Sequence, residues 1–307
     1  MRCFRFALLF IFLLWSAIAC LLDRPAHAES FQVTDALGRT LTFSKTPRRI
    51  VSLAPSITET LFALGVDQEI IGVTTSCDYP PQAKLKPKVG GLTTPNLETL
   101  VAMKPDLVIS VKGLHKFELV SEMDRLKIPF YVSDPSTVKK ILQEIRVIGR
   151  LTGRAKAGEQ LSETMEKRIE AVEAKVRGHQ RPAVLYVLWG DPLMTVGPGS
   201  YIEELIRISG GRGIVPEGRP AYTQLNMEEV LAEDPQVVIF ASEMGDDTVA
   251  AERQRWLRWT TLSAVKEHRL YTVDSNLLHR PGPRLVDGLE ALARLIHPEL
   301  FPDQSAK

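Results

Sequence analysis

The chain has 307 residues, of which 44% are hydrophobic and 24% are charged, and its formal net charge is +1. This composition is typical of a globular protein long enough to form two domains. The balance of charges excludes a general nucleic-acid-binding surface, which requires a marked excess of basic residues.

The first 28 residues have the pattern of a secretory signal peptide. Arg2 and Arg5 precede an apolar segment at residues 6–22, and Ala26-His27-Ala28 forms a signal-peptidase site. We therefore expect residues 1–28 to be removed and the mature protein to be exported. A membrane-spanning anchor is the alternative, but the small residues at the cleavage site favour removal.

The cysteines agree with export but provide no internal disulfide. Cys3 and Cys20 lie in the predicted signal peptide, so the mature chain keeps only Cys77. The segment Ala17-Ile18-Ala19-Cys20 is a weak lipoprotein box, which makes lipid attachment at Cys20 a less favoured alternative to simple cleavage.

The first half of the mature chain predicts alternating strands and helices. Alternating apolar residues indicate a β-hairpin at 31–43, followed by a buried strand at 49–54 and a helix at 56–64. A second strand at 70–73 leads into residues 74–96, a loop rich in proline and glycine. A loop of this length inside a compact domain is usually functional.

A long amphipathic helix is predicted at 154–176, after helices at 117–126 and 138–151 and a strand at 130–132. The apolar positions of the long helix recur every three or four residues, which places them on one face. These positions are Leu161, Met165, Ile169, Val172 and Val176.

The second half repeats the alternation of strands and helices, which is typical of mainly parallel sheets. Its predicted elements are a strand at 183–190, a loop at 191–199, a helix from Ser200, a loop-like segment at 210–222, a polar stretch at 242–248, a helix through Trp256 and Trp259, a strand at 270–273, a loop at 274–284 and a helix at 285–296.

An internal repeat relates the two halves. Residues 96–109 (NLETLVAMKPDLVI) match residues 226–239 (NMEEVLAEDPQVVI), and each copy predicts a short helix, a proline stop and a buried strand. The identical pairs are Asn96/Asn226, Glu98/Glu228, Ala102/Ala232, Pro105/Pro235, Val108/Val238 and Ile109/Ile239. Such units are common in α/β proteins, so chance similarity is the alternative to two related lobes.

A second correspondence lies upstream of each copy. In each half an apolar strand leads to a Ser-x-x-Glu pattern, Ser56/Glu59 in the first and Ser200/Glu203 in the second, which predicts two helix capping boxes. Two matching features in the same order favour an α/β fold of two lobes with mainly parallel central sheets. We expect an N-terminal lobe at 31–152, a bridging helix at 153–178 and a C-terminal lobe at 182–304.

Two loops on opposite lobes are the candidate ligand-binding segments. Residues 76–81 (SCDYPP) and 276–284 (NLLHRPGPR) each follow a predicted strand, where ligands bind in parallel sheets. With Trp189, Tyr201 and Tyr222 they form the walls of a cleft for a large, partly apolar ligand. The alternative is that they are surface turns whose arginines are merely solvated.

No nucleotide-binding motif is present, and the six histidines have no metal-ligand spacing. We therefore expect no catalytic residue, no metal site and no cofactor. A remote alternative is a secreted α/β enzyme with Cys77 as its nucleophile, although no activating pattern surrounds this cysteine.

Four segments resemble the iron-siderophore/haem/B12 substrate-binding family of ABC importers, and within it the B12-binding members. They are residues 48–65, 72–83, 96–109 and 279–284, and the resemblance extends from about residue 48 to residue 300. It implies a periplasmic-binding domain at 49–304 with the class III fold, in which one long helix joins two α/β lobes. It also implies a monomer that captures cobalamin or another corrinoid and delivers it to an ABC importer permease in the inner membrane.

The resemblance also implies roles for individual residues. The ligand residues are Ser76, Asn276, Leu277, Leu278, His279 and Arg280, with Cys77, Asp78, Tyr79, Trp189, Tyr201 and Tyr222 as further candidates. Glu98 and Glu228, one in each copy of the repeat, match the glutamates that dock onto the permease. Asn276, Leu277 and Leu278 replace an acid and two aromatic residues of the B12-binding members, so haem or a ferric siderophore is the alternative ligand.

Overall fold

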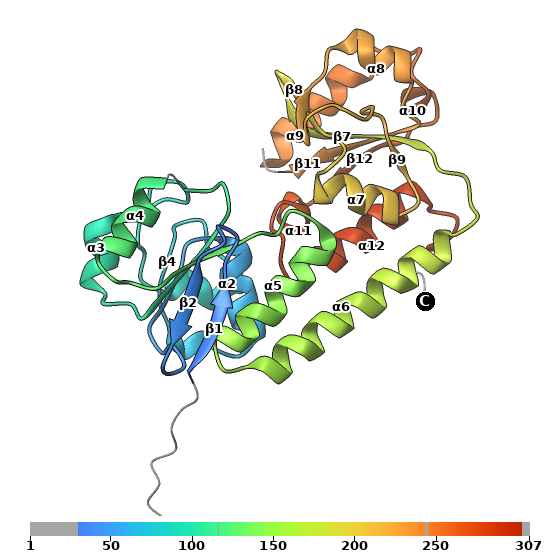
Figure 1. Ribbon diagram of the computed structural model, residues 1–307. Coiled ribbons are helices and arrows are strands. Elements are labelled where there is room, and N and C mark those ends of the chain that lie inside the picture. The colour runs from blue at the N-terminus through green and yellow to red at the C-terminus, as the bar shows by residue number, and fades with distance from the viewer. Residues whose placement is uncertain (1–29, 116, 243–244, 303–307) are drawn as a thin grey trace, which may run out of the picture.

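The computed structural model describes residues 30–115, 117–242 and 245–302, and the predicted signal peptide and Cys20 lie outside them. The chain forms two lobes connected by a pair of helices (Figure 1). The predicted α/β class with two lobes and a long connecting helix is confirmed. No helix of the described residues is both long and apolar enough to span a membrane.

The N-terminal lobe is built on a four-stranded parallel sheet in the order β4-β3-β5-β6. Its elements are β1 (Phe31–Thr34), β2 (Thr40–Phe43), β3 (Ile50–Ser52), α2 (Pro55–Ala63), β4 (Ile70–Val73), α3 (Leu97–Ala102), β5 (Leu107–Val111), α4 (Phe117–Arg125) and β6 (Phe130–Ser133). The strands β1 and β2 pair antiparallel, as the alternating sequence predicts.

The strands of this sheet are buried on both faces, which explains their nearly continuous apolar sequences. Alternate residues of β5 point to opposite sides, so Leu107 and Ile109 pack with α2, whereas Val108 packs with Leu100 and Met123 on the other side. A helical layer on each face therefore closes the lobe.

The C-terminal lobe has a six-stranded mixed sheet in the order β10-β8-β7-β11-β12, with β9 beside β7. Its elements are β7 (Ala183–Gly190), β8 (Leu193–Val196), α7 (Tyr201–Ile208), β9 (Arg212–Gly213), β10 (Tyr222–Gln224), α8 (Met227–Glu233), β11 (Val237–Ala241), α9 (Gly245–Trp256), α10 (Ser263–Lys266), β12 (Leu270–Val273), α11 (Ser275–Leu278) and α12 (Leu285–Ile296). Strands β7, β9, β11 and β12 are parallel, and β8 and β10 are antiparallel additions.

Four predictions for this lobe are corrected by the structure. The segment 191–199 contains β8, which folds back on β7 as a hairpin, and 210–222 contains β9 and the start of β10. The predicted helix through Trp256 is α9, but it begins at Gly245, inside the polar stretch at 242–248, and ends before Trp259. The segment 274–284 contains α11, whose first turn is capped by the Asp274 carboxylate. Strands β8, β9 and β10 and helix α11 are too short for periodicity to reveal them.

The two copies of the repeat also share their helix caps and backbone angles. Asn96 and Asn226 are both N-caps, of α3 and α8, and each amide side chain accepts a hydrogen bond from a backbone N–H three residues on. Lys104 and Asp234, which are equivalent in the repeat, both adopt positive φ just before the proline, with values of 47° and 41°. Shared strain at equivalent positions is a stronger sign of relatedness than shared apolar residues.

The predicted capping boxes are only partly correct. Ser200 caps α7 through its hydroxyl, which accepts from the N–H groups of Ile202 and Glu203. Ser56, in contrast, lies inside α2, whose N-cap is Ala54. Glu59 therefore belongs to no capping box, and its partners lie in the other lobe.

A second helix runs beside the long connecting helix and also contacts both lobes. The predicted long helix is α6 (Ala155–Val176), and it packs antiparallel to α5 (Val138–Leu151) (Figure 1). The first turns of α5 bury Val138 and Ile141 in the core of the C-terminal lobe, whereas Ile148 near its end is buried in the core of the N-terminal lobe. This helix therefore belongs to both cores.

Two glycines allow α5 and α6 to approach each other closely. A Cβ at Gly158 would lie 3.0 Å from the Ile145 carbonyl oxygen and 3.2 Å from the Gly149 Cα. Because backbone atoms form both contacts, a larger residue could be accommodated only by moving the helices apart.

We expect Gly158→Leu to destabilise the protein by about 1–3 kcal/mol, the usual cost of overpacking a tight interface. Urea unfolding would measure this change, with Glu163→Leu on the exposed side of α6 as the control. Equal stability of the two variants would contradict the close packing.

Candidate ligand-binding site

The two lobes face each other where the parallel strands of the N-terminal sheet end. Ala54 follows β3, Ser76 follows β4, Val111 ends β5 and Asp134 follows β6, and all four residues line cavities between the lobes. The opposite wall includes the segment 276–281, which follows β12. Ligands of α/β proteins usually bind at the carboxyl ends of strands, so the chain topology itself positions this cleft.

The first cavity, called the apolar cavity below, has a volume of about 330 Å³. Pro55, Leu92 and Leu114 form much of its N-terminal-lobe wall. Four predicted ligand residues line it together, one from the N-terminal lobe and three from the C-terminal lobe. They are Ser76, Asn276, His279 and Arg280.

The second cavity, called the polar cavity, has a volume of about 560 Å³. Lys112, Asp134 and Lys140 line it from the N-terminal lobe, and the predicted residues Tyr201 and Tyr222 line it from the C-terminal lobe. The two cavities share a wall that consists of Val111, His279 and Pro281. They are therefore neighbouring compartments of one cleft.

Several predicted ligand residues do not face these cavities. The Leu278 side chain is fully buried in the core of the C-terminal lobe, and Cys77 is 1% exposed in the core of the N-terminal lobe. The helical turn of α11 explains the first case, because it directs Leu278 inward while Asn276 lines the cavity. Leu277 and Trp189 line neither cavity, and the indole of Trp189 donates to its neighbour, the Asp191 carbonyl, at 2.8 Å.

A buried carboxylate joins the lobes beside the apolar cavity. The Glu59 side chain, on α2, is 2% exposed and accepts two hydrogen bonds from Arg284, with Nε to Oε2 at 2.8 Å and Nη2 to Oε1 at 2.7 Å. Arg280 Nη1 lies 3.2 Å from Glu59 Oε1 and donates to Asp78 Oδ1 at 2.5 Å. Both arginines precede α12 of the C-terminal lobe, so this interlobe ion cluster links the lobes directly.

Two of the predicted ligand residues, Asp78 and Tyr79, contact the arginines of the interlobe ion cluster. The Tyr79 ring lies under the Arg284 guanidinium, 3.8 Å from ring centroid to Cζ, which is a cation–π geometry. The hydrogen bond from Arg280 lowers the pKa of Asp78, despite the opposing effect of burial. A carboxyl with a lowered pKa stabilises the fold at neutral pH and loses this contribution as the pH falls through that pKa. Asp78 and Tyr79 thus hold the arginines.

Hydrogen bonds also fix the segment that carries His279. The Tyr186 hydroxyl, on β7, is 2.9 Å from His279 Nε2, and the Tyr201 hydroxyl donates to the Leu278 carbonyl at 2.8 Å. Gly282 packs against the start of α2, where a Cβ would lie 3.1 Å from the Ser56 carbonyl oxygen. The C-terminal wall of the cleft is therefore attached to both lobes.

Sequence reasoning missed Glu59, Lys112 and Lys140. The pattern around Glu59 resembled a capping box, and its true partners lie more than 200 residues away in the chain. Lys112 directly follows β5, so the rule that strand ends line the ligand site would have found it. Lys140 lies in the first turn of α5, and no local pattern distinguishes it.

Glu98 and Glu228 lie outside the cleft. They occupy the first turns of α3 and α8, are exposed, and have no ion-pair partner among the described residues. The two helices lie on the outer sides of their lobes (Figure 1).

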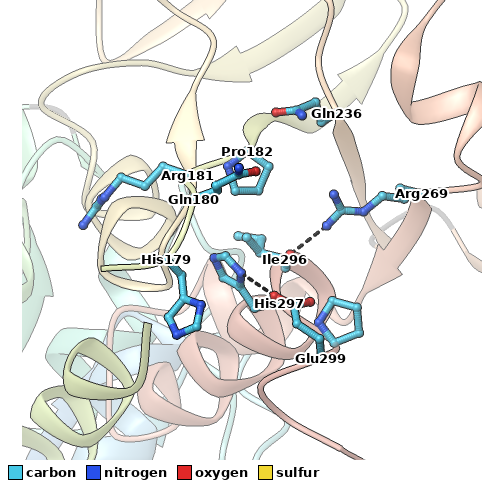
Figure 2. A pocket seen from close by; sticks show the side chains of 10 residues that line it. His179, Gln180, Arg181, Pro182, Gln236, Arg269, Ile296, His297 and Glu299 are labelled. Atoms are coloured by element: carbon cyan, nitrogen blue, oxygen red, sulfur yellow. Dashed lines mark hydrogen bonds and ion pairs between the residues drawn. The ribbon is translucent and has the colours of Figure 1, made fainter. Parts of the chain in front are cut away.

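A further cavity, of about 760 Å³, lies at the opposite end of the C-terminal lobe and contains no predicted site residue. Figure 2 shows His297 hydrogen-bonded to Glu299, and Arg269 to the Ile296 carbonyl, at distances of 3.0 and 2.7 Å. This cavity is lined by Pro182, Gln236 and Arg269, which directly precede the amino ends of β7, β11 and β12, so it lies away from the interlobe cleft. No group of three or more potential metal ligands occurs in the part of the chain that the structure describes.

A cleft between two α/β lobes that are joined by a helix pair is the architecture of a two-lobed ligand-binding protein. Comparison with known families agrees, because residues 50–277 match the family described as periplasmic binding protein. The chain belongs to this family.

The similarity extends to individual relatives. The chain is 30% identical over 288 residues to an uncharacterised ABC transporter substrate-binding lipoprotein of Bacillus subtilis, YvrC, covering 90% of this chain and 88% of that protein. It is 29% identical over 243 residues to the vitamin B12-binding protein of Vibrio cholerae, covering 79% of this chain and 86% of that protein.

Solved structures show the same fold. The periplasmic vitamin B12-binding protein BtuF of Vibrio cholerae superposes with a TM-score of 0.74 and 26% identity, covering 84% of this chain and 99% of that chain. The periplasmic heme-binding protein RhuT of Roseiflexus sp. RS-1 superposes with a TM-score of 0.74 and 25% identity, covering 82% of this chain and 99% of that chain.

We expect Glu59→Ala to destabilise the protein by about 3–5 kcal/mol, because it leaves two largely buried guanidinium groups without their shared carboxylate. Chemical unfolding would measure the loss. Glu122→Ala is the matched control, since Glu122 pairs with Arg125 on the surface, where water screens the pair and it contributes little to stability. A loss for Glu59→Ala no larger than the control's would show that the interlobe ion cluster does not hold the lobes together.

Proposed function

We propose that this protein captures vitamin B12 or another corrinoid between its lobes and delivers it to an ABC importer. The main support is the convergence of Ser76, Asn276, His279 and Arg280, from opposite lobes, on one cavity. The similarity to vitamin B12-binding proteins over most of the chain points to the same ligand class.

The chemistry of the cleft suits a large ligand with an apolar body and polar edges. Leu92, Leu114 and Pro55 offer surface for an apolar face, while Asn276 offers an amide. Of the Arg280 nitrogens, only Nη1 has a partner among the described residues, so Nε and Nη2 can donate to amide or phosphate oxygens.

Haem is the second candidate ligand. It is favoured by the superposition on a periplasmic heme-binding protein with the same TM-score, 0.74, as the B12-binding protein. His279 and Tyr222 in the cleft wall carry side chains that can ligate iron.

The proposed mechanism is capture rather than catalysis, in the periplasm and by a monomer. Because α5 contributes to both cores and the interlobe ion cluster joins the lobes, we expect closure on the ligand to be small. Glu98 and Glu228 would then dock onto a permease dimer with two basic sites.

Arg280→Ala should raise the dissociation constant for cyanocobalamin roughly 10- to 150-fold, the effect of losing one charge-assisted hydrogen bond of about 1.5–3 kcal/mol. Titration calorimetry of the purified protein with cyanocobalamin, and separately with haemin, would test this, with Arg125→Ala as the surface control. Ligand recovered unchanged from a one-to-one complex supports a binding protein. Failure of the wild-type protein to bind cyanocobalamin would reject the main proposal, and binding of haemin alone would establish the alternative.

Glu98→Ala combined with Glu228→Ala should leave ligand affinity unchanged and largely abolish the complex with the transporter. The physical reason is the loss of one carboxylate contact on each lobe. The control removes the same charge from the exposed face of α6, by Glu163→Ala combined with Glu173→Ala. Wild-type transporter affinity of the first variant, measured in low-salt buffer, would rule out the docking role and leave these acids to their helix N-termini.

A further inference from the structure

The two compartments of the cleft differ in charge. In the apolar cavity, Arg280 is the one lining residue with a lysine, arginine or carboxylate side chain, and Glu59 and Asp78 already pair with it. Counted with Arg284, the interlobe ion cluster has two positive and two negative groups. A ligand in the apolar cavity therefore meets no net charge.

The polar cavity carries an excess positive charge. Its lining includes two lysines, Lys112 and Lys140, and one acid, Asp134, and no other lysine, arginine or carboxylate side chain. Asp134 Oδ2 lies 2.6 Å from Lys140 Nζ and 3.9 Å from Lys112 Nζ. One carboxylate is thus shared by two ammonium groups, which leaves a net charge of about +1 at the wall.

The two lysines remain open to a ligand. Their side chains are 52% and 46% exposed, whereas the Asp134 side chain is 18% exposed. The opposite wall comes from the C-terminal lobe and includes Ser200 and Tyr222. An anionic group between these walls would receive ammonium donors from one side, and the phenol of Tyr222 is a hydroxyl donor on the other.

The position of this charge relative to the apolar cavity defines the kind of ligand. The two compartments are adjacent, because both are lined by Val111, His279 and Pro281. One ligand can therefore contact both cavities. Such a ligand has a mostly uncharged body and an anionic group at its periphery.

We propose that the polar cavity is an anion subsite in which Lys112 and Lys140 bind a phosphate or carboxylate group of the transported ligand. The inference rests on the proposed capture function. It adds which chemical group of the ligand the two lysines recognise. A corrinoid would supply the phosphodiester of its nucleotide loop, and haem would supply its propionate carboxylates. Asp134 lowers the net positive charge of the subsite, because its carboxylate compensates one of the two ammonium charges.

Pairs of ligands that differ in the anionic group provide the test. Cyanocobalamin carries the phosphodiester and dicyanocobinamide lacks it together with the rest of the nucleotide, whereas haemin carries carboxylates that its dimethyl ester lacks. Lys112→Gln combined with Lys140→Gln removes the subsite charge, and Lys139→Gln, on the neighbouring exposed position of α5, is the control. Calorimetric titrations at low and high salt would give the dissociation constants.

The double lysine variant should bind cyanocobalamin about tenfold more weakly than the wild type, the low end for a charge-assisted contact because the lysines are half exposed. Its affinity for dicyanocobinamide should not change, and the salt dependence of cyanocobalamin binding should largely disappear. Asp134→Asn should act in the opposite direction and tighten cyanocobalamin binding alone. If haem is the ligand, the same pattern should appear for haemin against its dimethyl ester.

Equal losses for cyanocobalamin and dicyanocobinamide would overturn the inference, because they would indicate a general change in the cleft. Unchanged binding of every ligand by the double lysine variant would overturn it as well. A wild-type protein that binds neither cyanocobalamin nor haemin would instead contradict the proposed function, so the two failures are distinguishable.

Discussion

The burial of Glu59 is the constraint on which the cleft depends. A carboxylate removed from water costs several kcal/mol unless charged donors replace its hydration. Arg284 and Arg280 provide three donating N–H groups, and both belong to the other lobe. Separating the lobes at this point would leave the carboxylate buried and unpaired, or would require α2 to open to solvent. The width of the apolar cavity is therefore set by an ion cluster and not by the connecting helices alone, and the same cluster holds Arg280 at the cavity wall.

The connecting helices add a second restraint of a different kind. Because α5 is buried at one end in the C-terminal core and at the other in the N-terminal core, a hinge within it would disrupt apolar packing in both lobes. Gly149 and Gly158 hold α6 against it at backbone contact distance. A cleft restrained in this way is largely formed before the ligand arrives. Less conformational freedom is then lost on binding, which favours affinity for the ligand.

The sequence predicted the parts of this fold that depend on local patterns. The repeat at 96–109 and 226–239, the long helix and α12 all follow from periodicity and punctuation, and Ser76, Asn276, His279 and Arg280 do line one cavity. Interactions between distant residues were not predictable. Glu59 stands in a Ser-x-x-Glu pattern, yet its partners are 221 and 225 residues away. Strands β8 and β10 have four and three residues, too few for a period, and they form by pairing with a neighbour, β8 with β7 and β10 with β8.

The two proposed tasks of the protein, docking and ligand binding, involve different parts of the structure. The first involves the repeated units, and the second involves parts that are not repeated. The repeat places Glu98 and Glu228 in equivalent helix turns, after equivalent asparagine caps, because the structural units α3-β5 and α8-β11 are related. The walls of the cleft come instead from segments outside 96–109 and 226–239. Under the proposed docking role, duplicated surface carboxylates would match a two-fold permease, since each half of the transporter would then meet the same geometry. A single asymmetric ligand would use the opposite arrangement, in which one compartment is neutral and apolar and the other is cationic. Divergence in the segments that line the cleft can therefore alter ligand binding without disturbing the surface that carries Glu98 and Glu228.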